Sequence, residues 1–497
     1  MKRVCLGFVL TLATSWCRAA DITPPQLVTL SLSTTNVEVS ESNQTILVTA
    51  RITDDLSGMG SAVPGDFSSG YLSCGFLSPS RKQQASFSLS AIHRVSGNEW
   101  DGIYTNQLVL PRYGESGVWT LQHASVRDAA GNQSALDYAA LLRLGILVEF
   151  NVTGTSDTNP PECLSFSFSP DLVDSVNSNR IQFTVRLKDD LSGIAPETGS
   201  YDFFSYSRAE FRSPSGLQGF SVIFYSSSRN SGDALDGVYT NSVLLLEFRE
   251  PGVWTLEGVS AHDAAGNQAS WAGAKLLALG FPTSLTITGM GDTNPPLLAG
   301  FSLTPTNVNT THSGQSIAVM AQVTDDLSGF GIPSPFTGGG IGGVSAEFTS
   351  PSGNQSTSVG LGPSFPASGV TLDASFTNSV SLPRYSEPGL WLLRYLAVVD
   401  KAGNYRQLDL AAVRNLGLPY SFTVEEFPRL EISRSEGTAI VSWPAYAGGF
   451  KLQTCGSLSE AADWSDVLAA PVQIGERLVL ASSLAVEQRF YRLIKRP

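Results

Sequence analysis

Acidic residues recur in three short loops of this chain, in an arrangement that could hold a metal ion. The motif Asp-Asp-Leu-Ser-Gly occurs three times, the motif Asp-x-Ala-Gly-Asn occurs three times, and an aspartate lies shortly before each of three Pro-Pro pairs. Carboxylate and amide oxygens are the ligands that calcium prefers, and the ion takes about six to eight oxygens. The candidate calcium ligands are Asp21, Asp54, Asp55, Asp128, Asp157, Asn159, Asp189, Asp190, Asp263, Asp292, Asn294, Asp325, Asp326 and Asp400.

The same loops have a second interpretation. Asp and Asn side chains bond to their own backbone and tolerate left-handed conformations, so they are also ordinary turn formers. The calcium hypothesis rests on charge, because several carboxylates gathered at one place repel one another unless a cation or water offsets their charge. The chain contains no Asp-x-Asp-x-Asp-Gly loop of the EF-hand type. The sequence alone therefore leaves both interpretations open.

The elements that carry these loops are predicted to be strands. Each Asp-Asp-Leu-Ser-Gly motif ends a stretch in which apolar and polar residues alternate, as they do in a strand with one buried face. The three stretches cover residues 46–58, 181–193 and 317–329, each ending at a Ser-Gly turn signal. The acidic residues are thus expected at the ends of half-buried strands.

The whole pattern repeats at an interval of about 135 residues, which is too long for a solenoid repeat and suits a complete domain. Trp119, Trp254 and Trp391 fall at this interval, each just after a turn signal. We predict that each tryptophan anchors the core of its repeat. The alternative is that these side chains stack on a carbohydrate.

Several alternating strands with turn signals between them are typical of β-sandwiches, so the predicted fold class is all-β. Paired prolines ahead of each copy favour stiff, extended joints, and three sandwiches in line would form a rod of about 120 Å. The predicted boundaries are residues 1–20 for a signal peptide, 21–156, 157–291 and 292–427 for three repeats, and 428–497 for a small C-terminal β domain.

The two acidic motifs and the Pro-Pro joints give residues 21–427 a resemblance to bacterial immunoglobulin-like repeats of secreted and surface proteins, and to cadherin-like modules. The resemblance implies tandem immunoglobulin-like β-sandwiches whose joints are stiffened by calcium. Residues 428–497 contain strand-like stretches at 439–444 and 489–493. This segment is similar to a trimmed fibronectin type III-like module.

In an immunoglobulin-like sandwich, the loop after the second strand and the loop before the last strand lie at one end of the domain. The two acidic motifs are expected in these loops, and the chain should enter at the same end. One acidic set is therefore expected at the joint between the first and second repeats, and another at the joint between the second and third. The remaining set, which begins with Asp21, is expected at a free N-terminal end.

Composition and the N-terminus narrow the class of protein. The chain has 497 residues and a formal net charge of -13, which argues against a nucleic-acid partner. Residues 2–20 combine a basic start, a short apolar run and small residues, as a secretory signal peptide does, and no later segment is apolar enough to span a membrane. The three remaining cysteines occupy no equivalent positions in the repeats, so no disulfide framework is expected: Cys74, Cys163 and Cys455.

No sequence motif for catalysis is present: there is no Gly-x-Ser-x-Gly, no His-Glu-x-x-His and no phosphate-binding glycine loop. The sequence therefore predicts a secreted, non-enzymatic structural or adhesion protein of the bacterial cell surface, whose partner is a surface glycan or protein. The alternative is a carbohydrate-binding or accessory protein of extracellular polysaccharide processing. In that case the variable middles of the repeats, at residues 67–75, 201–206 and 336–343, would form the sugar site.

Overall fold

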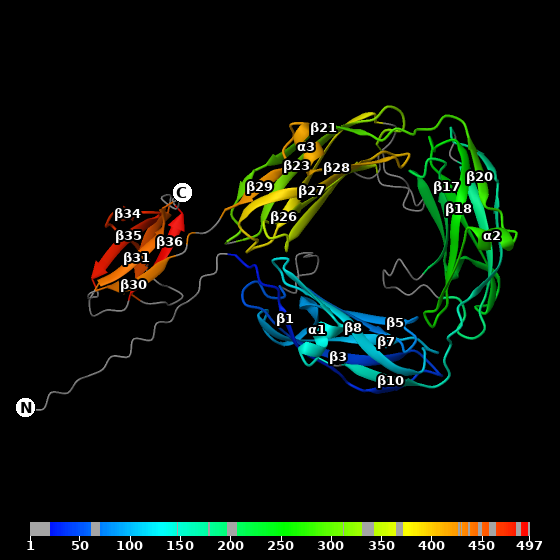
Figure 1. The fold of residues 1–497 in the computed structure, drawn as a ribbon, viewed down its shortest axis with the longest axis horizontal. Helices are drawn as coiled ribbons and strands as arrows, with labels where there is room; N and C mark the ends of the chain where they lie inside the picture. Colours follow the sequence, from blue (N-terminus) through cyan, green and yellow to red (C-terminus); the bar gives the residue numbers. More distant parts are fainter. Residues whose placement is uncertain are drawn as a thin grey trace, which may run out of the picture. The chain divides into compact units, whose positions relative to one another are not determined.

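The computed structural model describes residues 20–495 except 61–69, 147, 177–178, 196–205, 312, 331–341, 364–370, 426–427, 429, 436–437, 446–449, 457–463 and 484–488. Residues 1–19 of the predicted signal peptide therefore lie outside the described residues. The chain divides into two compact units, Asp21–Val424 and a second unit that contains Glu425–Pro497. Figure 1 shows that strands dominate both units, which confirms the all-β fold class.

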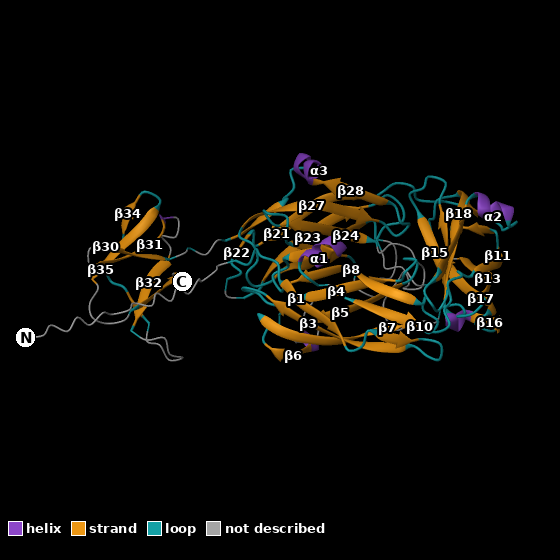
Figure 2. Ribbon diagram, turned by 60° about the horizontal axis from the view of Figure 1, so that its bottom comes forward, coloured by secondary structure: helices purple, strands orange, loops and turns teal. Residues whose placement is uncertain are grey.

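The first repeat is a sandwich of two sheets (Figure 2). One sheet has the order β1 (Gln26–Leu32), β3 (Gln44–Thr53), β7 (Asp101–Leu110) and β6 (Arg94–Gly97). The other has the order β2 (Asn36–Glu38), β10 (Glu149–Thr153), β8 (Gly117–Arg127), β4 (Tyr71–Leu77) and β5 (Gln84–Ser90), with β9 (Gln133–Asp137) paired to β8. A short helix, α1 (Tyr138–Arg143), follows β9 and is capped by Asp137.

The second repeat has the same topology. Its first sheet contains β11 (Glu162–Ser169), β13 (Asn179–Lys188), β17 (Asp236–Leu245) and β16 (Arg229–Gly232). Its second sheet contains β12 (Leu172–Asp174), β20 (Ser284–Thr288), β18 (Gly252–His262), β14 (Ser207–Arg212) and β15 (Gly219–Phe224), with β19 (Gln268–Ala272) paired to β18. The helix is α2 (Ala274–Ala278).

The third repeat follows the same plan, with three described strands in its first sheet: β21 (Leu297–Thr304), β23 (Gln315–Thr324) and β26 (Asp373–Leu382). Its second sheet contains β22 (Asn307–Val308), β29 (Ser421–Val424), β27 (Gly389–Val399), β24 (Gly343–Thr349) and β25 (Ser356–Leu361), with β28 (Tyr405–Asp409) paired to β27. The helix is α3 (Leu410–Asn415).

The C-terminal segment forms two small sheets. One contains β30 (Glu431–Ser435), β31 (Thr438–Pro444), β35 (Arg477–Ser483) and β34 (Val472–Ile474), and the other contains β33 (Ser465–Asp466), β32 (Phe450–Cys455) and β36 (Phe490–Lys495). Its core is small and centres on Trp443.

The cores explain why the repeats fold as they do. On β3 the side chains of Ile46, Val48 and Ala50 point to one face and are fully buried, as the alternation predicted. Trp119, Trp254 and Trp391 are at most 1% exposed, and each indole N–H donates to a glutamate carbonyl four residues earlier. The tryptophans are therefore core anchors, and the carbohydrate-stacking alternative for them is wrong.

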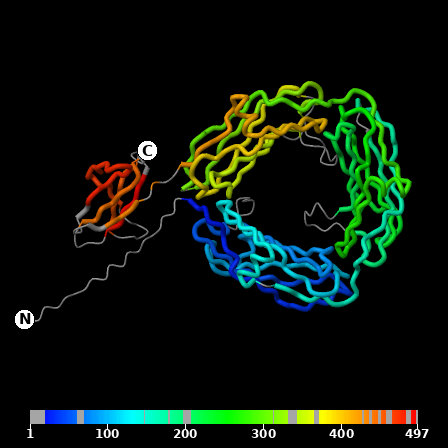
Figure 3. Tube along the Cα trace, in the orientation of Figure 1, coloured from blue at the N-terminus to red at the C-terminus, as the bar shows by residue number. Residues whose placement is uncertain are grey.

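The unit Asp21–Val424 is a closed ring of three sandwiches (Figure 3). Hydrogen bonds link the first repeat to the second and the second to the third, and equivalent bonds link the third back to the first. The predicted straight rod is therefore wrong. The three joints are equivalent, so each turns the chain by about one third of a revolution, and a repeated head-to-tail contact of that kind closes on itself.

Candidate metal centres at the three joints

A buried glutamine crosses each joint of the ring. At the first joint, between the first and second repeats, Gln83 Nε2 donates to the backbone carbonyl of Asp157 at 2.7 Å and to Asn267 Oδ1 at 3.0 Å. The backbone N–H of Asp157 in turn donates to the carbonyl of Tyr113 at 2.8 Å. We call this set the clasp. The second-joint clasp consists of Gln218, Asp292, Asn404 and Phe248, and the third-joint clasp of Gln355, Asp21, Asn132 and Tyr385.

Local bonds fix each clasp glutamine before it reaches the next repeat. Gln83 lies at the end of a Ser-Pro-Ser turn, where its N–H donates to Ser78 Oγ. Its Oε1 accepts the backbone N–H of Glu115 at 2.8 Å, and the Glu115 carboxylate accepts bonds from the Ser80 N–H and hydroxyl. The other two repeats repeat these contacts. The amide of the glutamine is thus oriented by its own repeat.

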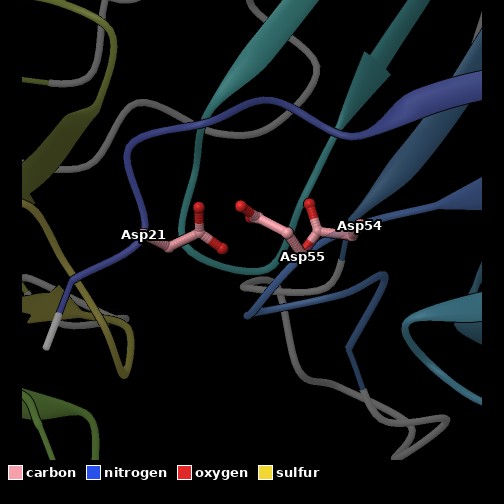
Figure 4. A group of neighbouring side chains, drawn as sticks. All are labelled: Asp21, Asp54 and Asp55. Atoms are coloured by element: carbon pink, nitrogen blue, oxygen red, sulfur yellow. The ribbon is translucent and has the colours of Figure 1, made fainter. Parts of the chain in front are cut away.

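An acidic triad lies beside each clasp. At the third joint, Asp21 comes from the entering chain, and Asp54 and Asp55 come from the loop that follows β3; their carboxylates face one another in Figure 4. Within each triad, one oxygen of every residue lies within 4.8 Å of the others. The triads are Asp21, Asp54 and Asp55; Asp157, Asp189 and Asp190; and Asp292, Asp325 and Asp326.

In each triad, one carboxylate oxygen of the first aspartate of the Asp-Asp pair has no hydrogen-bond partner. Asp189 Oδ2 accepts the N–H groups of Leu191 and Gly193, as a turn-forming aspartate does. Its Oδ1 is buried and has no hydrogen-bond partner, and Asp189 as a whole is only 5% exposed. Oδ1 of Asp54 and Oδ1 of Asp325 are in the same state. A buried carboxylate oxygen without a donor is costly, so the turn-forming role accounts for only half of each carboxylate.

The residues of a triad suit a hard cation. All the ligand atoms are oxygens, which favours calcium or magnesium over transition metals. Two oxygens on opposite sides of a calcium ion stand about 4.8 Å apart, at roughly 2.4 Å from the ion. Asp190 is exposed while Asp157 and Asp189 are buried, so water has access to one side of the first-joint triad. The residues present fit a partly hydrated calcium ion.

The two asparagines predicted as calcium ligands, Asn159 and Asn294, hold a triad carboxylate in place by donating a hydrogen bond to it. Asn159 Nδ2 donates to Asp190 Oδ2 at 2.7 Å, and Asn294 Nδ2 donates to Asp326 Oδ2 at 2.6 Å. At the third joint a hydroxyl replaces the amide, since Thr23 Oγ1 donates to Asp55 Oδ1 at 2.6 Å. These contacts hold the exposed carboxylate toward the entering chain.

The aspartates of the Asp-x-Ala-Gly-Asn motif are placed differently from the triads. Asp128 Oδ1 accepts the N–H groups of Gly131 and Asn132, and its Oδ2 accepts Asn132 Nδ2 at 2.7 Å. Asp263 and Asp400 make the same bonds. Each therefore orients the asparagine that receives the clasp glutamine, and none of the three belongs to a triad.

Burial controls the charge of these carboxylates. The pKa of Asp128, Asp263 and Asp400 is raised to about 7, mainly by burial, with a further contribution from neighbouring triad carboxylates and an opposing effect of their hydrogen bonds. Burial also raises the pKa of the first aspartate in each Asp-Asp pair, with repulsion from its triad partners as a smaller cause. At neutral pH each joint therefore holds more negative charge than its surroundings favour.

The raised pKa values predict how stability depends on pH in the presence of a chelator. A carboxyl whose pKa is raised by folding binds its proton more tightly in the folded state, so its stabilising contribution is present below about pH 4 and is lost as pH rises to about 7. We expect the urea concentration at the unfolding midpoint of the full chain to decrease as pH rises from about 4 to about 7. Asp263→Asn should reduce the fall by removing one titrating group, and an unchanged slope would contradict the assignment.

The clasp glutamines and asparagines are the residues that the sequence interpretation missed. Gln83, Gln218 and Gln355 each end a Ser-Pro-Ser turn, and none of the three belongs to a predicted motif. A glutamine fixed at the same place in three otherwise variable turns was the available signal. The acidic set of Asp21 was expected at a free end, and this expectation is wrong, because Asp21 is buried against the third repeat.

The second joint contains a buried arginine in addition to its clasp. Arg249 is 1% exposed, and its Nη1 donates across the joint to the carbonyl of Ala402 at 2.9 Å. Burial lowers its pKa to about 10, against the attraction of Asp400. Gly114 and Ser386 occupy the equivalent positions in the other repeats. The first and third joints are therefore the closest matched pair.

Other predicted features have the following positions. Cys74, Cys163 and Cys455 are buried, and none of the three is in a disulfide bond. Of the three variable middles, residues 67–69, 201–205 and 336–341 lie outside the described residues, whereas residues 71–75 belong to β4. Tyr206, which is described, packs edge-on against Tyr225 with ring centroids 5.5 Å apart. Among the helices of the described part of the chain, none combines the length and apolar character needed to cross a membrane.

Comparison with known proteins gives matches to solved structures only. No protein-family model matches the chain, and no curated protein matches it. The crystal structure of Dpr2 Ig1-Ig2 in complex with DIP-Theta Ig1-Ig3 is similar over 82% of this chain and 100% of that chain, with 9% identity and a TM-score of 0.13. An ICAM-5 ectodomain fragment is similar over 94% of this chain and 100% of that chain, with 13% identity and a TM-score of 0.16.

A bacterial structure is also similar. Yersinia pseudotuberculosis adhesin InvE matches over 56% of this chain and 66% of that chain, with 11% identity and a TM-score of 0.15. The β-sandwich architecture of the three repeats rests on the strand order described above.

Proposed function

We propose that this chain is a secreted, non-enzymatic structural or adhesion protein of the bacterial surface, whose three immunoglobulin-like repeats are held in a ring by calcium bound at the joints. The observation that carries the proposal is the orphaned Oδ1 of Asp189, which is buried within a group of three carboxylates. The same arrangement is present at all three joints. Charge at these points has a structural use, because the first aspartate of each triad also takes part in the clasp through its backbone.

Calcium would act on the joint through residues that already hold it. Asp157 offers its carboxylate to the first-joint triad while its backbone carbonyl and N–H take part in the clasp. An ion that fixes the Asp157 carboxylate therefore also fixes the backbone that Gln83 grips. Asp189 and Asp190 supply the other carboxylates from the second repeat. Binding to the folded joint alone raises its stability by mass action.

The first test is calcium binding by the full chain, measured by calorimetry and by thermal unfolding with calcium or chelator. We expect three ions per chain, and a stabilisation of about 2.7 kcal/mol at a hundredfold excess of calcium over the dissociation constant. Asp190→Asn should remove one of the three ions. Asp171→Asn, which makes the same charge change at an exposed position outside the triads, should leave all three. Absence of any calcium-induced shift would exclude the calcium part of the proposal.

The adhesive part needs a separate test, because a metal-bound ring can serve other structural purposes. Beads coated with the full chain should adhere to bacterial surface preparations, and adhesion should fall when chelator is added. Asp190→Asn should weaken adhesion more than Asp171→Asn does. Beads that bind no surface under any of these conditions would contradict an adhesive role and leave a purely structural one.

A further inference from the structure

The third joint differs from the other two in how its faces are connected. At the first and second joints the chain itself runs from one repeat to the next, through residues 153–162 and 288–297. At the third joint, Gln355 in the third repeat meets Asp21 and Asn132 in the first, and the chain does not link them directly. This joint is held by non-covalent contacts alone.

The two faces of the third joint are complementary in a head-to-tail sense. One face presents the glutamine amide and the Tyr385 carbonyl, and the other presents the Asp21 backbone and the Asn132 amide oxygen. The clasp distances at the first and third joints differ by at most 0.1 Å. Because the contact joins two different faces, the faces can belong to one molecule or to two molecules.

The surroundings of the third joint are less filled than a repeat core. A cavity of about 790 Å³ opens between the two repeats, lined by Ser57 and Ala129 of the first repeat and by Gln315 and Tyr385 of the third. The third joint also has Ser386 where the second joint has the cross-joint arginine Arg249. Its separation therefore requires the loss of one clasp, whereas the triad of Asp21, Asp54 and Asp55 belongs to the first repeat alone.

We infer that the faces of the third joint form an interaction surface for a second copy of this chain. When the joint opens, the Gln355 face of one molecule binds the Asp21–Asn132 face of another, and head-to-tail assemblies result. Within one molecule the two faces are tethered, so they bind each other at a high effective concentration, in the millimolar range for short flexible tethers. Binding to a second molecule competes with this closure. Closed single rings are therefore expected at low protein concentration, and exchange between molecules at high concentration.

Two complementary variants of the full chain test this inference. Gln355→Arg spoils one face and Asn132→Arg spoils the other, so neither variant alone retains a matched pair of faces. Each should be an opened monomer, with a larger radius of gyration by small-angle scattering than the unaltered chain. Mixed in equal amounts, the two variants retain one intact pair between molecules. We expect a complex of twice the mass of one chain, measured by light scattering after size-exclusion chromatography over a concentration series.

The first joint provides the matched control. Gln83→Arg and Asn267→Arg make the same changes where the chain links the two faces, so this mixture should stay monomeric. Near-ultraviolet circular dichroism should show native tryptophan packing in every variant, and the milder pair Gln355→Ala and Asn132→Ala replaces any variant that fails this check. A third-joint mixture that stays monomeric, or single variants that stay closed, would overturn the inference.

The inference does not depend on the proposed calcium sites, and the experiment keeps the two apart. Each mixture is measured with calcium and with chelator. Complex formation that is the same in both conditions would support the interaction surface while contradicting a calcium effect on the joints. Calcium binding by the two variants without complex formation would support the calcium sites and contradict the interaction surface.

Discussion

Gln83→Leu should lower the free energy of unfolding of the full chain by about 2–6 kcal/mol, because it leaves two polar groups of the joint without a partner at about 1–3 kcal/mol each. The groups are Asn267 Oδ1 and the Glu115 N–H. The Asp157 carbonyl loses one of two bonds, since it also accepts from Asn267 Nδ2. Leucine nearly matches glutamine in volume, so lost packing contributes little to this result. The measurement is urea unfolding at constant calcium concentration.

The neighbouring residue is the control for this prediction. Gln84 is exposed on β5, and Gln84→Leu makes the same chemical change with no clasp to break. We expect its effect to be within about 0.5 kcal/mol, as for surface substitutions in general. Equal effects at the two positions would mean that the clasp does not stabilise the joint. Scattering should also show whether Gln83→Leu opens the first joint and so lets water reach the orphaned groups.

Trp254→Ala should lower the free energy of unfolding by about 3–5 kcal/mol, the usual range for removing a large aromatic side chain from a core. Trp254 is fully buried, lies 5.6 Å from the Phe220 ring by centroids, and donates to the Glu250 carbonyl at 2.8 Å. Glu250 also holds the turn that carries Gln218. The substitution should therefore loosen the second joint as well as the core of the second repeat.

A second tryptophan of the same repeat separates these contributions. Trp271, on β19, is only partly buried and packs against the edge of the same core. Trp271→Ala should cost less in urea unfolding and should leave hydrogen exchange at the Gln218 turn unchanged. Trp254→Ala should speed exchange at that turn. Equal costs for the two substitutions would contradict the anchoring role of Trp254.

The strands, the turns and the core tryptophans were predictable because each leaves a local mark in the sequence. Alternation fixes which face of β3 is buried, and Gly-Asn marks the turn between β8 and β9. The ring left no such mark. Its curvature depends on the angle at which Gln83 meets Asp157, and these residues are far apart in the chain. Pro-Pro pairs stiffen the linker but do not set that angle.

The candidate site was predictable in the same uneven way. Charge and spacing pointed to the acidic loops, and the structure brings Asp157, Asp189 and Asp190 together. The sequence could not separate the triad carboxylates from Asp263, since all are aspartates in turn motifs. The difference lies in their bonding: Asp263 has donors on both oxygens, whereas Asp189 has one oxygen without any.

The closure of three equivalent joints limits how this chain can change in length. Because the bend at every joint is about one third of a revolution, a fourth repeat joined in the same way would run into the first. Gain or loss of a repeat, an easy change for a straight array, is therefore penalised here. The bends must also add up to a full turn, so a substitution that widens the first joint strains the other two. The repeats are duplicates in sequence but are no longer independent in their mechanics.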